Sequence, residues 1–558
     1  MTDKPSADLD SDIILRPTRL FTELDACIAE DREAGQSHVG SSMSPSPSRQ
    51  ELDRQIDVSL RHAIRSFAAR WLHLVPQAEP FVPPHQCIVR ELWRASRRDM
   101  LKVINRVSYR SVLTLFLFGL TPIPVGVSEE EEMDGLTGQI CVQTALQQVQ
   151  RLRERQRNYQ FNGSKVSLGP DVSMSMSSSP APTPSSNITS TFLSAESRAY
   201  WGALIFDTSA SLTLNFRSSL TSGLHGVGTE SSWQALKMGA GSFHTRTEEW
   251  RRGSVELTED MVKQVIAAAS AGNLYLLKMI AVLKEALREG YEEKKLAGAW
   301  TCALEALDMF KVTFLPLLRL CQRRLRFLGQ VERLNWYELM LHHFLGILLL
   351  IDGIEAADRS DLLSQLTETR ADAEREILNT LQFGLDSTYL VHGVHHTNTV
   401  TNTVTNTNTN TNTSTNTSTN SLLGNNPLSG NTDTNPLLGN TNTNPLSGVQ
   451  STNTNTNTNT NPLSGALGNF ALSRSSVLSA SFVAIDPFPH HVVAAVQLMH
   501  KVVSREYDQR RITLDTCQRL TSTLLQALEH APQTSKSVDA ARQELSGELE
   551  ILMSGRRR

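Results

Sequence analysis

The sequence lacks paired cysteines. No two of its six cysteines are spaced as C-x-x-C, and this spacing excludes both a zinc finger and a small disulfide-stapled domain. The cysteines stand far apart in the chain, at Cys27, Cys87, Cys141, Cys302, Cys321 and Cys517. We therefore expect free thiols, and no metal or other cofactor bound by this chain.

Catalytic signatures are also missing. The sequence contains no G-x-x-x-x-G-K-[ST] phosphate loop, no H-E-x-x-H zinc helix and no G-x-S-x-G nucleophile elbow. His392, His395 and His396 stand close together, but no cysteine or carboxylate accompanies them and a polar tract follows them, so we predict no metal site there. The sequence therefore predicts that the chain is not an enzyme.

The chain has neither a strong charge imbalance nor a membrane-length apolar run. Its 53 Lys and Arg against 57 Asp and Glu give a net charge of -4, so any contact with nucleic acid must be local. The run Leu339–Ile351 is 13 residues long and holds two histidines, whereas a spanning helix needs about 20 apolar residues. We expect a buried core helix there, and the polar, acidic start of the chain favours an intracellular protein without a membrane partner.

Apolar residues spaced by three and four predict helices along most of the chain. The first such pattern runs from about Glu51 to Pro76, and its polar side carries Arg54, Arg61, Arg65 and Arg70. Period-two strand patterns do not compete with the helical ones. The predicted fold class is all-α, a multi-helix globular domain with long disordered low-complexity insertions. Further helices are predicted over about 87–104, 112–120, 135–157, 257–289, 296–328, 331–353, 358–381, 512–528 and 537–553.

Composition divides the chain into parts. The acidic and Ser/Pro-rich residues 1–48 predict a disordered leader, and residues 49–390 a helical body interrupted by a disordered Ser/Pro/Thr loop over 162–190. Residues 397–465 repeat Thr-Asn, which offers no apolar face, so a disordered insertion is predicted. Residues 480–553 predict C-terminal helices that pack back on the main domain.

Two histidine pairs stand in apolar surroundings. His342 and His343 lie in the most apolar predicted helix, and His490 and His491 follow a proline at a helix start. Satisfied core or capping histidines are the ordinary interpretation of both pairs. A pH-sensitive or ligand-facing role is the alternative.

Two stretches resemble a known family. They are Ser108–Gly126 (SYRSVLTLFLFGLTPIPVG) and Arg198–Ser209 (RAYWGALIFDTS). Both resemble the middle homology region of fungal-specific transcription factors, the regulatory body of zinc binuclear cluster proteins. In that family Arg-x-x-Tyr-Trp precedes an aromatic residue and Asp, whereas here a single residue separates the arginine from the tyrosine. Phe344–Asp352 and Asp486–Val496 are also similar to segments of such proteins.

The resemblance implies a regulatory role in the nucleus and cytoplasm, with proteins of the transcription machinery and a small-molecule inducer as partners. The candidate regulatory or ligand-facing residues are Arg198, Tyr200, Trp201, Phe206 and Asp207. They could instead be structural, because aromatic residues at helical spacing usually pack in the core and the two charged residues could make local polar contacts. The family role implies that they shape an inducer pocket or an inhibitory surface.

The family usually carries an N-terminal zinc cluster, two C-x-x-C pairs each followed by a third cysteine, whose short helix enters the major groove. The first 86 residues of this chain contain only Cys27. We therefore expect DNA contact only indirectly, or through a cluster missing from this sequence, and zinc only in the second case. Two hypotheses follow: a transcription regulator, or a non-DNA-binding scaffold or corepressor that acts with a zinc-cluster partner.

Overall fold

The fold is described in a computed structural model that places residues 12–37, 47–75, 85–133, 137–162, 190–253, 256–392 and 477–554. These residues are helical almost throughout, so the all-α prediction is confirmed. The predicted Thr-Asn insertion over 397–465 lies outside the described residues, as does the predicted loop over 162–190 apart from its two end residues.

Helix α4 is the centre of the N-terminal part. Its sequence YRSVLTLFLFGL is apolar on nearly every side, and such a helix needs cover all around. Helices α1, α2, α3 and α6 all contact it. The elements of this part are α1 (Asp12–Ser37), α2 (Pro47–Ala68), the 3-10 helix η2 (Ala69–Leu74), α3 (His85–Met100), α4 (Tyr109–Leu120), α5 (Glu129–Met133), α6 (Gly138–Asn162) and α7 (Ser190–Thr213).

Helix α1 corrects the prediction of a disordered leader over residues 1–48. Leu20, Phe21, Leu24 and Ile28 recur at helical spacing, and they join the core that α1 shares with α4 and α7. The ring of Phe21 meets that of Tyr109 edge-on, with centroids 6.3 Å apart. The acidic and Ser/Pro-rich residues on either side obscured this short apolar stripe.

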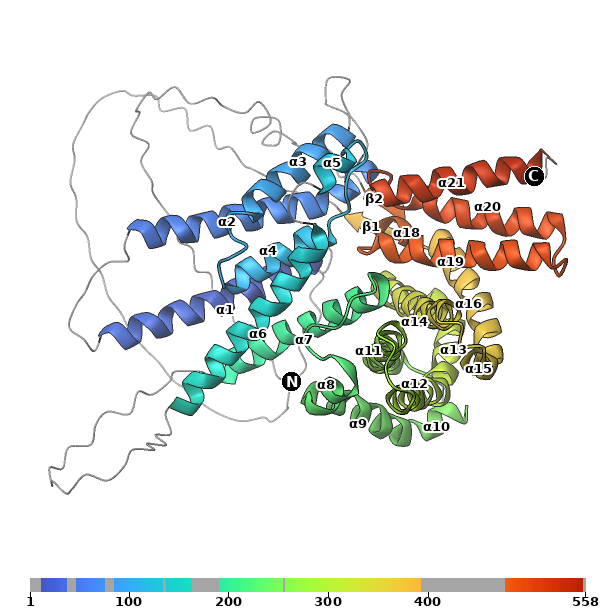
Figure 1. The fold of residues 1–558 in the computed structure, drawn as a ribbon, viewed down its shortest axis with the longest axis horizontal. Helices are drawn as coiled ribbons and strands as arrows, with labels where there is room; N and C mark the ends of the chain where they lie inside the picture. The colour runs from blue at the N-terminus through green and yellow to red at the C-terminus, as the bar shows by residue number, and fades with distance from the viewer. Residues whose placement is uncertain are drawn as a thin grey trace, which may run out of the picture. The chain divides into compact units, whose positions relative to one another are not determined.

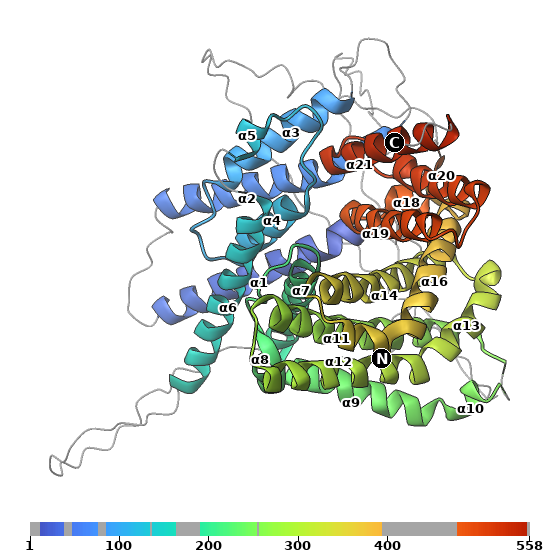
Figure 2. The same ribbon diagram turned by 45° about the vertical axis from the view of Figure 1, so that its right-hand side comes forward.

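Helices α11 and α14 form the centre of the second part, and Figures 1 and 2 show them running side by side between α12 and α16. The elements of this part are α8 (Gly223–Thr229), α9 (Ser231–Arg246), α10 (Glu248–Arg251), α11 (Glu259–Arg288), α12 (Glu293–Thr313), α13 (Leu315–Arg324), the 3-10 helix η3 (Leu325–Phe327), α14 (Gln330–Ala356), α15 (Ser360–Leu363), the 3-10 helix η4 (Ser364–Leu366) and α16 (Thr367–Asp386).

Helices α11 and α14 are long and apolar enough to cross a bilayer. In each of them, however, 67% of the most apolar window is buried by the rest of the protein. The predicted apolar run Leu339–Ile351 lies inside α14, and its side chains pack into the common core. Burial of this kind is the property of a core helix.

The C-terminal part begins with a small sheet that the sequence did not predict. Strands β1 (Thr388–His392) and β2 (Val477–Ser481) pair in antiparallel register, with Thr388 opposite Ser481 and His392 opposite Val477. The helices that follow are α18 (Phe482–Ile485), α19 (Pro489–Asp508), α20 (Leu514–His530) and α21 (Lys536–Met553). Helix α19 contacts α14 and α16, α18 and α20 contact α16, and α21 packs on α19 and α20.

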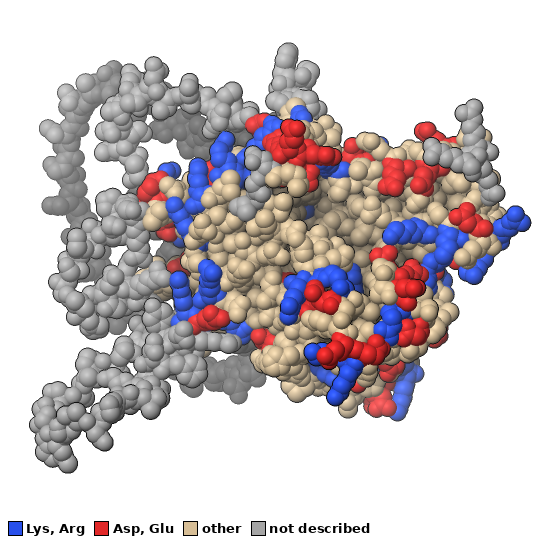
Figure 3. Space-filling view, viewed as in Figure 1, with Lys and Arg blue, Asp and Glu red and all other residues tan. Residues whose placement is uncertain are grey.

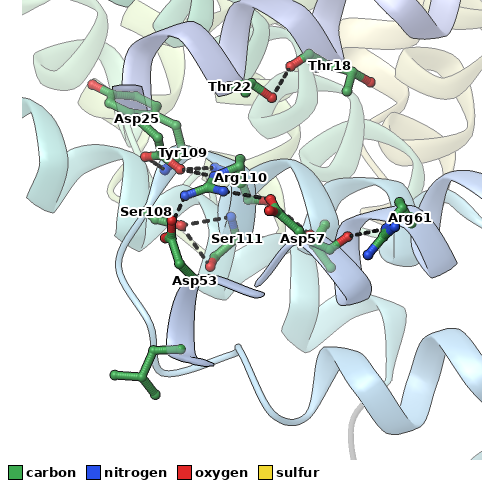
Figure 4. A network of polar contacts seen from close by, with 12 residues as sticks. Thr18, Thr22, Asp25, Asp53, Asp57, Arg61, Ser108, Tyr109, Arg110 and Ser111 are labelled. Carbon is green, nitrogen blue, oxygen red and sulfur yellow. Dashed lines mark hydrogen bonds and ion pairs between the residues drawn. The ribbon is translucent and has the colours of Figure 1, made fainter. Parts of the chain in front are cut away.

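Arg110 ties α4 to α1 and α2 (Figure 4). Its Nε donates to Asp25 Oδ2 of α1 at 2.9 Å, and its two Nη atoms reach Asp57 at 2.6 Å and Asp53 at 2.8 Å on α2. Asp25 also accepts the backbone N–H groups of Tyr109 and Arg110, at 2.7 and 3.0 Å. The side chain of Arg110 is only 13% exposed and that of Asp25 only 9%. Asp25 therefore caps α4 while it pairs with Arg110.

Replacing Arg110 with alanine should lower the free energy of unfolding by about 3 kcal/mol, because it leaves the buried Asp25 carboxylate without its cation. The exposed partners Asp53 and Asp57 should contribute little to this loss. Urea denaturation followed by circular dichroism measures the change. The matched control is Arg61→Ala, which removes an exposed arginine bonded only to a backbone oxygen and should shift stability by less than about 0.5 kcal/mol. Equal losses of unfolding free energy in the two variants would contradict the role of Arg110 as the cation that neutralises Asp25.

Candidate functional site

Helix α7 carries all five candidate residues and contacts α1, α6, α11 and α14. Of the five, Arg198 is exposed, Trp201 and Phe206 are half-buried, and Tyr200 and Asp207 are buried. The helix therefore does not gather them into one pocket. It distributes them over several different contacts along its length.

Tyr200 takes part in a polar group near the first half of α7. Its hydroxyl donates to Glu230 Oε2 at 2.9 Å, and the guanidinium of Arg153 lies 3.6 Å above its ring. Arg153 also lies 3.7 Å from Glu230 and 3.8 Å from Glu196. Burial and the Glu230 charge raise the pKa of Tyr200. The tyrosine is therefore a neutral donor that joins α7 to the start of α9.

Trp201 and Phe206 make aromatic contacts with other helices. The Trp201 ring meets Trp233 of α9 edge-on at 6.2 Å, and the Phe206 ring stacks on Phe116 of α4 at 4.5 Å. Offset or edge-on pairs of this kind stabilise packing by about 1 kcal/mol beyond burial. Both aromatic residues are half-buried and pack against the core.

Asp207 is the anchor of the loop after α7. It accepts a short hydrogen bond from the Ser218 hydroxyl, and its two oxygens accept the backbone N–H groups of Ser219 at 2.7 Å and Leu220 at 3.2 Å. Ser218 in turn accepts from the ammonium of Lys278 at 2.7 Å. Asp207 and Lys278 are both fully enclosed, so this chain of contacts fixes the loop to α11.

Lys278 is a buried cation between two buried carboxylates. Burial lowers the pKa of Lys278 to about 8, and the charges of Asp207 and Glu285 oppose this shift. Glu285 accepts from Ser222 at 2.6 Å and from Tyr291 at 3.2 Å, while its other oxygen finds no partner among the described residues. Lys278 is not among the residues predicted from the sequence. A lysine inside the apolar run around residues 274–283 is the feature that indicates a buried charge there.

The second half of α7 meets the histidines. Ser209 Oγ lies 3.2 Å from His491 Nε2, and His491 Nδ1 lies 3.0 Å from His342 Nε2. The rings of His490 and His491 are 4.2 Å apart. Burial lowers the pKa of His342 and of His490 to about 4. Burial and the charges of His490 and His342 also lower the pKa of His491 well below its ordinary value. The three imidazoles are therefore neutral at pH 7.

Arg70 corrects the prediction that it lies on the polar side of its helix, because the side chain is 2% exposed. At Ala69 the α-helix gives way to the tighter turn of η2, which rotates Arg70 inward. Its guanidinium donates to the carbonyls of Phe67 and Leu120, each at 2.9 Å, and to that of Pro487. Burial lowers the pKa of Arg70 to about 9, against the opposing charge of Asp486.

Asp486 is the acidic neighbour of this arginine, and Glu338 lies near Asp486. Asp486 is fully buried, and one of its oxygens accepts the backbone N–H of Phe488 at 2.7 Å while the other finds no partner among the described residues. Burial raises the pKa of Asp486, although the hydrogen bond and Arg70 oppose this. Burial and the nearby Asp486 charge raise the pKa of Glu338 to about 8. We name Arg70, Ser209, His342, Asp486 and His491 the polar junction.

The polar junction joins segments that are remote in the sequence. It connects η2, the end of α4, α7, α14 and the start of α19, and these include parts of three of the stretches on which the family resemblance rests. Within the described residues, no group of three His, Cys, Asp or Glu side chains could hold a metal ion. The contacts of the junction are hydrogen bonds made by a buried guanidinium, a hydroxyl and two imidazoles.

In comparisons with known proteins, no family model, curated protein or solved structure matches the chain. The site must therefore be interpreted from its own geometry. Two features of it can be tested directly, the buried lysine and the acidic neighbour of the polar junction.

Lys278 should make stability depend on pH in the alkaline range. Its pKa falls from 10.5 in the unfolded chain to about 8 in the fold, so the unfolded chain binds more protons between these values and stability rises with pH there. We expect the free energy of unfolding of wild type, relative to Lys278→Met, to increase by about 3 kcal/mol from pH 8 to pH 10.5. Urea denaturation of both proteins measures it. A difference in unfolding free energy between the two proteins that stays constant from pH 8 to pH 10.5 would contradict the lowered pKa of Lys278.

Glu338 should act with the opposite sign at lower pH. Its pKa rises from 4.5 in the unfolded chain to about 8 in the fold, so its contribution to stability is present below pH 4.5 and is lost as the pH approaches and passes 8. Glu338→Gln should therefore melt at a higher temperature than wild type at pH 8, and this gain should shrink at pH 5. Scanning fluorimetry at both pH values measures the two melting temperatures. An equal gain in melting temperature at both pH values would show that ionisation of Glu338 does not destabilise the fold.

Proposed function

We propose that the chain is a transcription regulator, the helical regulatory body of a protein of the fungal zinc-cluster type. One observation carries the proposal: the stretches that resemble that family come together in space. Phe116 of the first stretch stacks on Phe206 of the second, at 4.5 Å. Ser209 of the second stretch then meets His491 of the C-terminal stretch, at 3.2 Å.

The third stretch belongs to the same centre. His342 stands two residues before Phe344–Asp352 on α14, and it meets His491 at 3.0 Å. These stretches contribute to one contiguous core. Their convergence favours a common regulatory body, in which a contact at one helix changes the packing of the others.

This body would act through partners. Figure 3 shows Lys and Arg interspersed with Asp and Glu on the face viewed, and the net charge of the chain is -4, so neither feature favours binding to DNA phosphates. We therefore propose proteins of the transcription machinery and a small-molecule inducer as its partners. DNA would be reached through a zinc cluster outside this sequence or through another chain.

The second candidate is a scaffold or corepressor that acts with a zinc-cluster partner and does not touch DNA itself. The cysteines favour it. All six are free, and Cys141, Cys321 and Cys517 are buried separately in the core. None of them is available in a set that could ligate zinc.

A reporter assay tests the regulatory role. The full chain fused to a heterologous DNA-binding domain should change the expression of a reporter several-fold, in either direction. His491→Ala should alter that change, because it removes the link between α7, α14 and α19, while the exposed control His225→Ala should not. Equal protein levels and melting temperatures are checked for both variants.

The outcomes separate the candidates. A gel shift with the purified chain alone that reads a specific sequence would exclude the scaffold. Recovery of the chain on promoters only when a zinc-cluster protein is present would favour the scaffold. Exclusion of the chain from the nucleus, together with an unchanged reporter and unchanged transcripts after deletion, would refute both.

A further inference from the structure

A pocket lies at α13, α14 and α16, away from the polar junction. Its volume is about 330 Å³, within the usual range for small-molecule sites. Its apolar surface comes from Leu315 and Leu318 of α13 and from Met340 and Phe344 of α14. Leu318, Met340 and Phe344 are buried, so they form the floor of the pocket. Neither the candidate residues of α7 nor the junction takes part in it.

The two walls of the pocket carry opposite charges. Arg319 and Arg323 line it from α13, and Asp372 and Glu376 line it from α16. The spacing of four residues places each pair on one face of its helix. One wall is therefore cationic and the other anionic, above a shared apolar floor.

The opposite charges do not reach each other. Among the described residues no ion pair joins α13 to α16, and neither Arg319 nor Arg323 pairs with any carboxylate. The two acids instead share Arg375 of their own helix, at 2.7 Å from Asp372 and 3.5 Å from Glu376. The charges of the two walls are therefore not paired with each other, and a bound molecule that carries both charges could bridge them.

We propose that this pocket binds a short apolar peptide with free termini, two or three residues long. The ammonium group would face Asp372 and Glu376, the carboxylate would face Arg319 and Arg323, and the side chains would cover Met340 and Phe344. An extended chain spans about 3.4 Å per residue, so such a peptide separates its terminal charges by about 7 to 10 Å.

Arginine is suited to the carboxylate end. Its planar fork binds a carboxylate through two parallel hydrogen bonds, and charge-assisted bonds of this kind are about twice as strong as neutral ones. Removing one terminal charge from the peptide should therefore weaken binding markedly. Removing the apolar side chains should abolish the contact with the floor.

Calorimetry with purified full-length protein tests the proposal. Tri-leucine should bind, its C-terminal amide and its N-acetyl derivative should each bind about tenfold more weakly, and tri-glycine should not bind measurably. In the double variant Arg319→Gln, Arg323→Gln the free acid and the amide should bind equally. In Asp372→Asn, Glu376→Gln the free amine and the acetylated peptide should bind equally.

The matched control is Arg326→Gln, an exposed arginine of η3 that does not line the pocket and should leave binding unchanged. Absence of tri-leucine binding to wild type would overturn the proposal. Equal binding of the free and capped peptides would also overturn it, because it would indicate simple apolar adsorption. The assay uses no promoter and no partner, so its result is independent of the transcription proposal.

Discussion

The structure depends on one cation that is held away from water. The guanidinium of Arg70 donates to carbonyls of the end of α2, of the end of α4 and of the turn before α19, and these belong to segments up to more than 400 residues apart in the chain. Removing an arginine from water costs several kcal/mol, so it must find its acceptors in the folded state. The N-terminal helices and the C-terminal helices therefore stabilise each other, and neither set satisfies Arg70 alone.

Helix α7 takes part in two polar groups. At Asp207 it reaches the buried Lys278 of α11 through Ser218, and two residues later, at Ser209, it reaches His491 of α19. Two polar groups that are separate in space thus share one helix. A displacement of α7 of an ångström or less would disturb both sets of short hydrogen bonds, whose strength falls steeply with distance and angle. The fold thereby couples the loop after α7 to the C-terminal helices.

Helical periodicity predicted the class of the fold because most helices bury one broad apolar stripe. It failed where local signals conflicted with tertiary packing. Helix α1 stands among acidic and Ser/Pro-rich residues, Arg70 turns inward only because η2 replaces the α-helix, and each strand is five residues long and finds its partner across 84 intervening residues. The candidate residues of α7 were recognisable by motif. Their partners were not, since periodicity describes a helix but not the neighbours that cover it.

Strands β1 and β2 have an evolutionary consequence for the Thr-Asn tract between them. Their register holds residues 392 and 477 opposite each other as a backbone pair. Tandem Thr-Asn codons are prone to gain and lose copies during replication, and such changes would lengthen or shorten only the segment beyond this pair. The paired strands therefore hold residues 392 and 477, which precede and follow the repeat in the sequence, next to each other. Alleles with different copy numbers can share an identical helical core, and the repeat can drift without selection for the fold opposing it.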